Sequence, residues 1–207
     1  MDARQFQSRS GVSRETVDRL AALEALLNKW NPRINLVSRS TLPEFWSRHV
    51  LDSWQLVPLV PQDAATWVDL GSGGGFPGLV VAATHGAAVT LVESDARKCA
   101  FLREAARAMG LTITIRNARI ETVRDLQADI VSARALAPLP VLLEWAAPFM
   151  RPDSLAAFLK GQDVESELTE ATKCWKFERE SHESLSDGAG SVLLLRGLER
   201  HGQPTSP

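Results

Sequence analysis

The most constraining feature of the sequence is a glycine-rich segment at residues 69–78 (DLGSGGGFPG), placed between an apolar run and a helical pattern. Glycines at a strand-to-helix turn let the backbone bend tightly and let a ligand approach where a Cβ would clash. Five glycines within eight positions exceed what a plain tight turn needs. The dinucleotide fingerprint G-x-G-x-x-G would place glycine at Phe76, so the strict match is G-x-G-x-G, formed by Gly71, Gly73 and Gly75. The segment predicts a cradle for a cofactor.

Apolar runs alternate with helical patterns after residue 60, which predicts a mostly parallel sheet with helices on both faces. The expected strands cover 66–70, 89–93, 112–116, 130–133, 155–159, weakly 174–178, and 192–196; the expected helices cover 78–84, 96–109, 140–149 and 164–172, with a turn at 120–123. Residues 181–190 are too few and too polar for a crossover helix, so the last two strands should form an antiparallel hairpin. The pattern resembles the Rossmann-like fold of class I S-adenosylmethionine-dependent methyltransferases.

The first sixty residues predict an N-terminal helical cap. Apolar residues three or four apart predict a helix over 13–31, with Ser13 as its N-cap and Asn31-Pro32 as its end. A capping box beginning at Thr41 predicts a second helix that continues to Pro58. We therefore expect a cap over residues 1–60, a Rossmann-like domain over 61–200 and a flexible tail over 201–207.

Glu93 ends the second expected strand, where a carboxylate can accept hydrogen bonds from both hydroxyls of a ribose. Methyltransferases and NAD enzymes share this feature, so it indicates an adenosyl cofactor without choosing between them. The chain has no tyrosine, which excludes a tyrosine-based short-chain dehydrogenase. Ser72 lacks the G-x-S-x-G context of a serine hydrolase.

Composition excludes several classes of protein. Two cysteines, Cys99 and Cys174, are too few for a disulfide scaffold or a structural zinc site, and we expect no metal. The N-terminus lacks the apolar segment of a signal peptide and no stretch is long enough to span a membrane, so we expect a cytoplasmic protein. The net charge is −2, but residues 97–134 carry eight Lys and Arg against four Asp and Glu, which is compatible with a phosphate-rich partner or with a solvated helix face.

Five strings in one order identify a family resemblance. They are residues 29–36 (KWNPRINL), residues 48–53 (RHVLDS), the glycine segment ending at Gly78, residues 132–135 (SARA) and residues 159–161 (LKG). In this order they resemble the RsmG (GidB) family, over roughly residues 20 to 198. The resemblance implies a bacterial enzyme that methylates one guanine N7 of 16S ribosomal RNA, with S-adenosyl-L-methionine as donor and S-adenosyl-L-homocysteine as product. It also implies a small ribosomal subunit or an assembly intermediate as partner, and we expect a monomer.

The resemblance implies roles for individual residues. Gly71 and Phe76 would line the donor, and Glu93 would hold its ribose. Ile120 and Glu121 would hold the adenine edge, and Arg134 would contact the donor or the incoming base.

The chemistry of the acceptor atom agrees with this hypothesis. Residues 132–135 lack both the Asn/Asp-Pro-Pro-aromatic string of amine methyltransferases and a cysteine nucleophile. Guanine N7 carries an exposed lone pair and no proton, so its attack on a sulfonium methyl needs no general base. Positioning should supply most of the rate, and Arg134 is the candidate catalytic residue in that sense.

Four further residues are candidates for substrate binding. His49 and Asp52 lie three apart on the second expected helix, where they would shape the mouth of the site or tie the cap to the sheet. Asn35 would bond a base edge or close the turn after Pro32, and Lys160 would contact an RNA phosphate or be a solvated lysine.

Alternative functions stay open at this point. The same cradle would serve a methyltransferase that acts on a small molecule or a protein, or an NAD-dependent oxidoreductase. A third alternative is a non-catalytic RNA-binding module.

Overall fold

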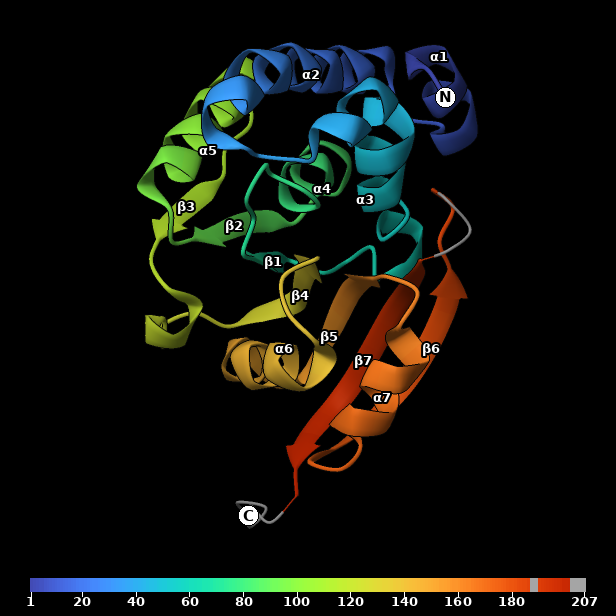
Figure 1. The fold of residues 1–207 in the computed structure, drawn as a ribbon, viewed down its shortest axis with the longest axis vertical. Coiled ribbons are helices and arrows are strands. Elements are labelled where there is room, and N and C mark those ends of the chain that lie inside the picture. Colours follow the sequence, from blue (N-terminus) through green and yellow to red (C-terminus); the bar gives the residue numbers. More distant parts are fainter. Residues whose placement is uncertain (187–189, 202–207) are drawn as a thin grey trace.

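The computed structural model describes residues 1–186 and 190–201, and its elements alternate between strands and helices after the N-terminal region (Figure 1). The strands are β1 (Thr66–Leu70), β2 (Ala88–Glu93), β3 (Thr114–Asn117), β4 (Ala128–Arg134), β5 (Met150–Lys160), β6 (Trp175–Glu183) and β7 (Ser191–Arg200). The α-helices are α1 (Ala3–Ser10), α2 (Arg14–Ile34), α3 (Asp52–Trp54), α4 (Gly78–Thr84), α5 (Ala96–Ala108), α6 (Leu139–Ala146) and α7 (Val164–Ala171). The remaining helical turns are η1 (Arg39–Glu44), η2 (Phe45–Leu51), η3 (Val57–Leu59), η4 (Ile120–Thr122) and η5 (Ala147–Phe149).

The seven strands form one sheet in the order β3-β2-β1-β4-β5-β7-β6. The pairs from β3 to β5 are parallel, whereas β7 is antiparallel to both β5 and β6. This topology confirms the predicted fold class and the terminal hairpin. The order of the chain reverses between β1 and β4, and open α/β sheets bind ligands at the carboxyl ends of the strands beside such a reversal.

Helices cover both faces of the sheet. The N-terminal helices, α4 and α5 lie on one face, and α6 and α7 lie on the other (Figure 1). Side chains alternate between the two faces along a strand. Trp67 of β1 therefore packs on the face covered by α4, α5 and the N-terminal helices, and Val68 packs on the face covered by α6 and α7. Phe6, Leu20 and Phe45 belong to the same hydrophobic cluster as Trp67. The predicted division at residue 60 therefore crosses a continuous apolar core, and it stays a prediction.

The N-terminal helices differ from their predictions. Helix α1 was not predicted; Asp2 caps it, Gln5 completes the capping box, and Phe6 is fully buried. Helix α2 does not end at Asn31-Pro32 but continues to Ile34, with Pro32 inside its last turn. The buried Asn31 side chain accepts from the backbone N–H groups of Leu36 and Val37, at 2.7 and 2.9 Å, and so stabilises the end of the helix.

The second predicted helix is a succession of shorter ones, η1, η2, α3 and η3, of which η2 is a π-helix. The predicted capping box at Thr41 is wrong. The Thr41 hydroxyl lies inside η1, where it donates to the Ser38 carbonyl and contacts His49. A π-helix widens the backbone spiral, and such turns are frequent at functional sites.

The other elements lie close to their predicted positions. β1 and α4 have the predicted bounds, whereas β5 begins five residues earlier than expected and β6 and β7 extend further. The tail predicted over 201–207 falls, apart from His201, outside the described residues.

Candidate functional site

The glycine segment forms the loop between β1 and α4, and it is fixed to the end of β2. The N–H groups of Gly71 and Ser72 donate to the Val92 carbonyl at 2.9 and 3.2 Å. Gly73 has φ +52° and Gly75 has φ +88°, a region that favours glycine. A Cβ at Gly75 would collide with Leu79, whereas a Cβ at Gly73 would meet nothing nearer than the Gly71 carbonyl oxygen at 3.7 Å. The loop therefore keeps open space at Gly73.

Glu93 lies at the carboxyl end of β2 and joins the glycine loop to the start of α5. Its Oε2 accepts from the Gly73 N–H at 2.9 Å, and its Oε1 accepts from the Asp95 N–H at 2.8 Å. The side chain is buried. Because each carboxylate oxygen has two lone pairs, each oxygen can still accept one further hydrogen bond.

Two adjoining pockets lie at this edge of the sheet. The smaller, of about 290 Å³, is lined by the predicted residues Gly71, Glu93, Ile120, Glu121 and Arg134. The larger, of about 860 Å³, is lined by the predicted residues Gly71, Gly73, Phe76, His49, Asp52, Arg134 and Lys160. Gly71 and Arg134 line both, and the Leu136 side chain lies against Gly71 where the pockets meet. Gly75 and Asn35 are not among the described residues that line either pocket.

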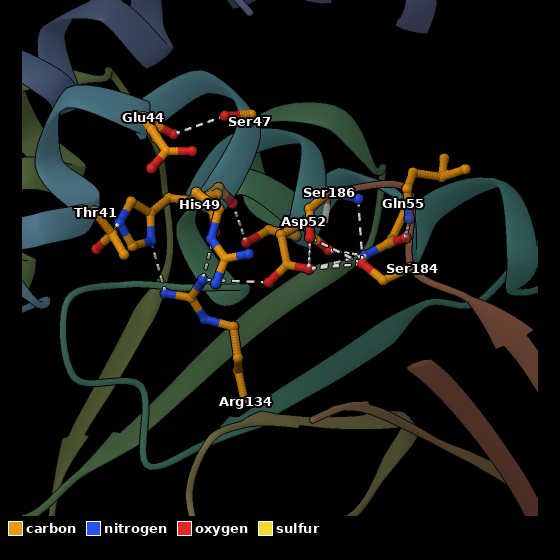
Figure 2. Close-up of polar contacts among 12 residues, drawn as sticks. Thr41, Glu44, Ser47, His49, Asp52, Gln55, Arg134, Ser184 and Ser186 are labelled. Carbon is orange, nitrogen blue, oxygen red and sulfur yellow. Dashed lines mark hydrogen bonds and ion pairs between the residues drawn. The ribbon is translucent and has the colours of Figure 1, made fainter. Parts of the chain in front are cut away.

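Arg134, the last residue of β4, projects towards η2 and α3 (Figure 2). Its Nη1 donates to the Arg48 carbonyl at 3.1 Å and to Asp52 Oδ2 at 3.3 Å, and its Nη2 lies 3.2 Å from His49 Nδ1. The guanidinium carbon also lies 5.0 Å from the centre of the Phe76 ring. Burial lowers the pKa of Arg134, and the neighbouring Asp52 carboxylate opposes that shift. These contacts fix the guanidinium between the N-terminal helices and the glycine loop.

His49 is a neutral imidazole in this environment. Burial, followed by the positive charges of Arg134 and Arg48, lowers the pKa of His49 from 6.5 to about 3. Arginine only donates, so Nδ1 accepts from Arg134 and the proton is on Nε2, which donates to Thr41 Oγ1 at 3.0 Å. Both ring nitrogens of His49 are therefore engaged.

Asp52 connects Arg134 to the turn of the β6–β7 hairpin, as Figure 2 shows. Its Oδ1 accepts from Ser186 Oγ at 2.9 Å and from Gln55 Nε2 at 3.0 Å. Gln55 in turn donates to Ser184 Oγ at 3.2 Å and accepts from the Leu185 N–H at 2.7 Å. Sequence reasoning did not find Gln55, Ser184 or Ser186, because the two serines lie more than 120 positions from Asp52 and Gln55 and meet them only in the fold.

Asp69, which supports the glycine loop from below, is a further residue that sequence reasoning did not single out. It is completely buried at the end of β1 and accepts from Ser132 Oγ at 2.8 Å and from the Gly78 N–H at 3.3 Å. Burial raises the pKa of Asp69 to about 6, although the hydrogen bonds favour the charged form. The sequence signal that could have indicated Asp69 is an acidic residue within the mainly apolar strand 66–70. Asp69 ties the glycine loop to β4.

Lys160 and Asn35 differ from what their sequence positions indicate. The Lys160 side chain is only 8 % exposed and is not a solvated lysine; its Nζ contacts Glu167 at 2.5 Å and donates to the Ala137 carbonyl at 2.9 Å. Asn35 is exposed, has φ +43° and donates its backbone N–H to the Asn31 carbonyl at 3.1 Å, so it closes the end of α2.

Within residues 1–186 and 190–201, no group of three or more His, Cys, Asp or Glu side chains is placed to hold a metal ion. No helix in the same part of the chain is long and apolar enough to cross a membrane.

Comparison with known proteins gives a family match and full-length relatives. The model of the GidB family, rRNA small subunit methyltransferase G, matches residues 16–194. The ribosomal RNA small subunit methyltransferase G of Parvibaculum lavamentivorans is 53 % identical, over 100 % of this chain and 93 % of the relative. The protein of the same name from Paramagnetospirillum magneticum is 52 % identical, over 97 % of this chain and 98 % of the relative.

Solved structures show the same fold at low sequence identity. A ribosomal protein L11 methylase from Lactobacillus delbrueckii subsp. bulgaricus superposes with a TM-score of 0.58 at 16 % identity, over 71 % of this chain and 77 % of the other. A TehB-like SAM-dependent methyltransferase from Corynebacterium glutamicum superposes with a TM-score of 0.58 at 14 % identity, over 86 % of this chain and 98 % of the other. These likenesses extend to the fold alone.

Proposed function

The chain belongs to the GidB family of rRNA small subunit methyltransferases G, and from that premise we propose that it transfers the methyl group of S-adenosyl-L-methionine to N7 of one guanine in 16S rRNA. S-adenosyl-L-homocysteine is the second product. The observation that carries the proposal is the junction of the two pockets at Gly71 and Arg134. One pocket suits the donor nucleoside, and the other leaves room for the acceptor base.

The residues around the smaller pocket fit the donor. Glu93 keeps acceptor capacity on both carboxylate oxygens, which suits the two hydroxyls of a ribose. Ile120 and Glu121, in η4, line the same pocket and would bound the adenine edge. Gly71 and the open space at Gly73 lead from there into the larger pocket, where Phe76 forms part of the wall. The bound donor supplies the methyl group as a sulfonium cation.

The side chains around the larger pocket suit a transfer that needs no general base. Guanine N7 attacks with its own lone pair and loses no proton, so the site has to align two reactants. His49 uses both ring nitrogens and has a pKa of about 3, and both oxygens of Asp52 already accept hydrogen bonds. His49 is therefore not available to remove a proton, and Asp52 is held in place by Arg134 and by Ser186 of the hairpin turn. This arrangement favours a ring nitrogen over an amine or a hydroxyl as acceptor.

Arg134 is the positioning residue of this site. Its guanidinium is held by the Arg48 carbonyl, Asp52 and His49, and it lines both pockets. We infer that its remaining N–H groups contact an oxygen of the bound reactants, such as guanine O6 or the donor carboxylate. A fixed cation beside a sulfonium would disfavour the donor, so the guanidinium should contact these oxygens and not the methyl group.

We also propose the setting in which the enzyme acts. Its acceptor is 16S rRNA within the small ribosomal subunit or an assembly intermediate, because a folded particle adds shape and contacts that a chain of net charge −2 does not supply alone. The enzyme acts as a monomer in the cytoplasm. Of the other site residues that the sequence predicts, Gly75 shapes the loop, and Asn35 is proposed only as a contact outside the pockets.

The test is methyl transfer from labelled S-adenosyl-L-methionine to small subunits, free 16S rRNA and total protein, all prepared from cells lacking this gene. Chemical cleavage then maps N7-methylguanine. We expect label at one guanine N7 of 16S rRNA. Label in protein or in a small molecule, or protection from thermal unfolding by NAD and not by the methyl donor, would overturn the proposal.

A further inference from the structure

The basic side chains of this protein differ in whether a neighbour neutralises them. Among the described residues after position 135, every Lys and Arg apart from Arg196 forms an ion pair. In the basic segment 97–134, Arg116 pairs with Asp125, Arg119 pairs with Glu121, and Arg134 is engaged inside the site. Cations already paired with carboxylates are poor ligands for a further anion. The cations open to an anionic partner at the site are therefore among the remainder.

Lys98 is such a cation, and it lies at the junction of the two pockets. It lines both of them, and within the described part of the chain its ammonium group has no hydrogen-bond or ion-pair partner. It belongs to the first turn of α5, which contains Arg97 and Lys98 and no acidic residue. The positive end of the helix dipole disfavours each cation in the first turn by about 0.3–1 kcal/mol. Helix stability therefore does not explain why Arg97 and Lys98 occupy the first turn of α5. Asp95 caps the helix and pairs with Arg97 only.

Arg33 and Arg39 do not line the larger pocket, but they flank in sequence Leu36, Val37 and Ser38, which do. Trp30 of α2 packs against Phe101 of α5 at 5.9 Å between ring centres, and Lys29 pairs with Glu104 at 3.6 Å. Arg33 follows one turn later and shares the face of α2 that carries Lys29 and Trp30.

Arg39 lies in η1 between Ser38 and Thr41, which both line the larger pocket. Arg33 and Arg39 are exposed, and neither has a side-chain partner among residues 1–186 and 190–201. Lys98 in the pocket wall, and Arg33 and Arg39 on the segments next to that wall, are thus three unneutralised cations on α5, α2 and η1.

We propose that Arg33, Arg39 and Lys98, here named the cationic rim, bind phosphates of the RNA strand on either side of the target guanine. This inference rests on the proposed function and assigns the surface by which the acceptor docks. Phosphate contacts set the position of a nucleic acid on a protein, whereas contacts to the base decide identity. The rim lies on the α2 and α5 side of the larger pocket, and the Ser184 and Ser186 side chains lie on the hairpin side. The RNA backbone therefore enters along α2 and α5.

The experiment compares the triple variant Arg33→Gln, Arg39→Gln, Lys98→Gln with a matched control. The control is Arg4→Gln, Arg9→Gln, Arg14→Gln, which removes three exposed cations at the other end of α2 and in α1 that have no ion-pair partner in the described part of the chain. A helix of 21 residues is about 30 Å long, so the control positions are remote from the rim. The affinity of each protein for small subunits lacking the modification is measured between 50 and 200 mM salt, roughly the range over which phosphate contacts weaken.

We expect the rim variant to bind the particle at least about tenfold more weakly at the lower salt. The slope of log K against log salt should decrease by about 2, since each phosphate contact contributes about 0.7 on a single strand. The control should keep the wild-type affinity and slope. Donor affinity, measured by calorimetry, should be unchanged in both variants. An unchanged slope in the rim variant, or an equal loss in the control, would overturn the proposal.

Two further measurements distinguish a donor contact from an RNA contact, and a failure of the proposed function from a failure of the cationic rim. If Lys98→Gln alone weakens donor binding, its ammonium contacts the donor carboxylate and the assignment to RNA phosphate is wrong. If the wild-type enzyme transfers no label to RNA, the proposed function fails, whereas the affinity and its salt slope still report on the rim.

Discussion

At the residue scale, the Arg134–Asp52 pair connects β4 to the N-terminal helices. Both side chains are less than a fifth exposed, at 18 % and 17 %. We expect Arg134→Ala to reduce the free energy of unfolding by about 3 kcal/mol, because it leaves a partly buried carboxylate without its cation. Methyl transfer should fall about a hundredfold, since the reactants lose their alignment. Unfolding in denaturant and single-turnover kinetics measure the two effects.

The double variant Arg134→Ala, Asp52→Ala is the control for this pair. Residues in direct contact give coupling energies of about 0.5–3 kcal/mol. The double variant should therefore lose less free energy of unfolding than the sum of the losses in the two single variants. If the two single losses add up to the loss in the double variant, the interaction between Arg134 and Asp52 does not contribute to the free energy of unfolding.

Gly73 allows a direct test of the cofactor cradle, because a second glycine matches it in conformation. Gly73 has φ +52° and Gly11 has φ +70°, and a Cβ at Gly11 would meet nothing within 4 Å. Gly73→Ala and Gly11→Ala should each lower the free energy of unfolding by about 1 kcal/mol, the cost of a left-handed conformation. Only Gly73→Ala should weaken donor binding, by more than about tenfold, because only Gly73 lines the site. Calorimetry with equal donor affinity in both variants would contradict the cradle.

His49 and Asp69 make opposite contributions to stability at acid pH. The pKa of His49 falls to about 3 in the folded protein, so between pH 6.5 and 3 only the unfolded chain takes up that proton, and stability decreases as the pH falls. The pKa of Asp69 rises to about 6, so between pH 6 and 3.8 the folded protein takes up a proton that the unfolded chain does not, and stability increases as the pH falls.

The two effects should largely cancel between pH 6 and 4 in the wild-type protein. In Asp69→Asn the His49 effect is left alone, and the free energy of unfolding should decrease by up to about 1.4 kcal/mol per pH unit over that range. Denaturant unfolding at a series of pH values measures it. Parallel pH profiles for the wild-type protein and this variant would show that Asp69 keeps an ordinary pKa.

At the scale of elements, the loop between β4 and α6 depends on β5 and α7. Lys160 of β5 donates to the Ala137 carbonyl, and Glu167 of α7 accepts from the Leu139 N–H at 2.6 Å. The two side chains also pair with each other, and Lys160 is nearly buried. This ion pair holds the loop that follows Arg134, including Leu136 at the junction of the pockets.

Lys160→Met should therefore lower kcat by at least about tenfold through misplacement of that loop, with a smaller change in donor affinity. Lys160→Arg, which keeps the charge, should restore part of the loss. Steady-state kinetics with donor and particle varied in turn separate kcat from the two KM values. A selective rise in the KM for RNA, with kcat unchanged, would instead support a direct contact with RNA.

At the scale of the whole molecule, the N-terminal helices complete the core. Phe6, Leu20 and Phe45 share a hydrophobic cluster with Trp67 and Phe101 of the remaining chain. A fragment of residues 61–207 should lack a cooperative thermal transition and bind a hydrophobic dye, because α4 and α5 lose the N-terminal helices that pack against them. Adding a peptide of residues 1–60 should reverse part of this. A fragment that unfolds cooperatively by itself would establish the predicted division at residue 60 as a domain boundary.

The sequence by itself determined the elements around the cradle. β1 and α4 have their predicted bounds, and the left-handed glycines between them and Glu93 at the end of β2 follow from local pattern. Alternation of strands with helices predicted a mostly parallel sheet, and a last connection too short for a helix predicted the antiparallel hairpin at its end. These features depend on neighbours within a few positions, so the order of residues is enough to specify them.

Only the tertiary structure decided how the polar residues of the site are used. His49 and Asp52 meet Arg134 across more than 80 positions, and Ser186 meets Asp52 across 134. The sequence left Lys160 open as a phosphate ligand or a solvated lysine, whereas the structure shows it as a nearly buried partner of Glu167. Helix α1 packs on the rest of the chain through the buried Phe6 side chain. Burial and ion-pair partners depend on which segments pack together, and a single sequence does not contain the distances that decide them.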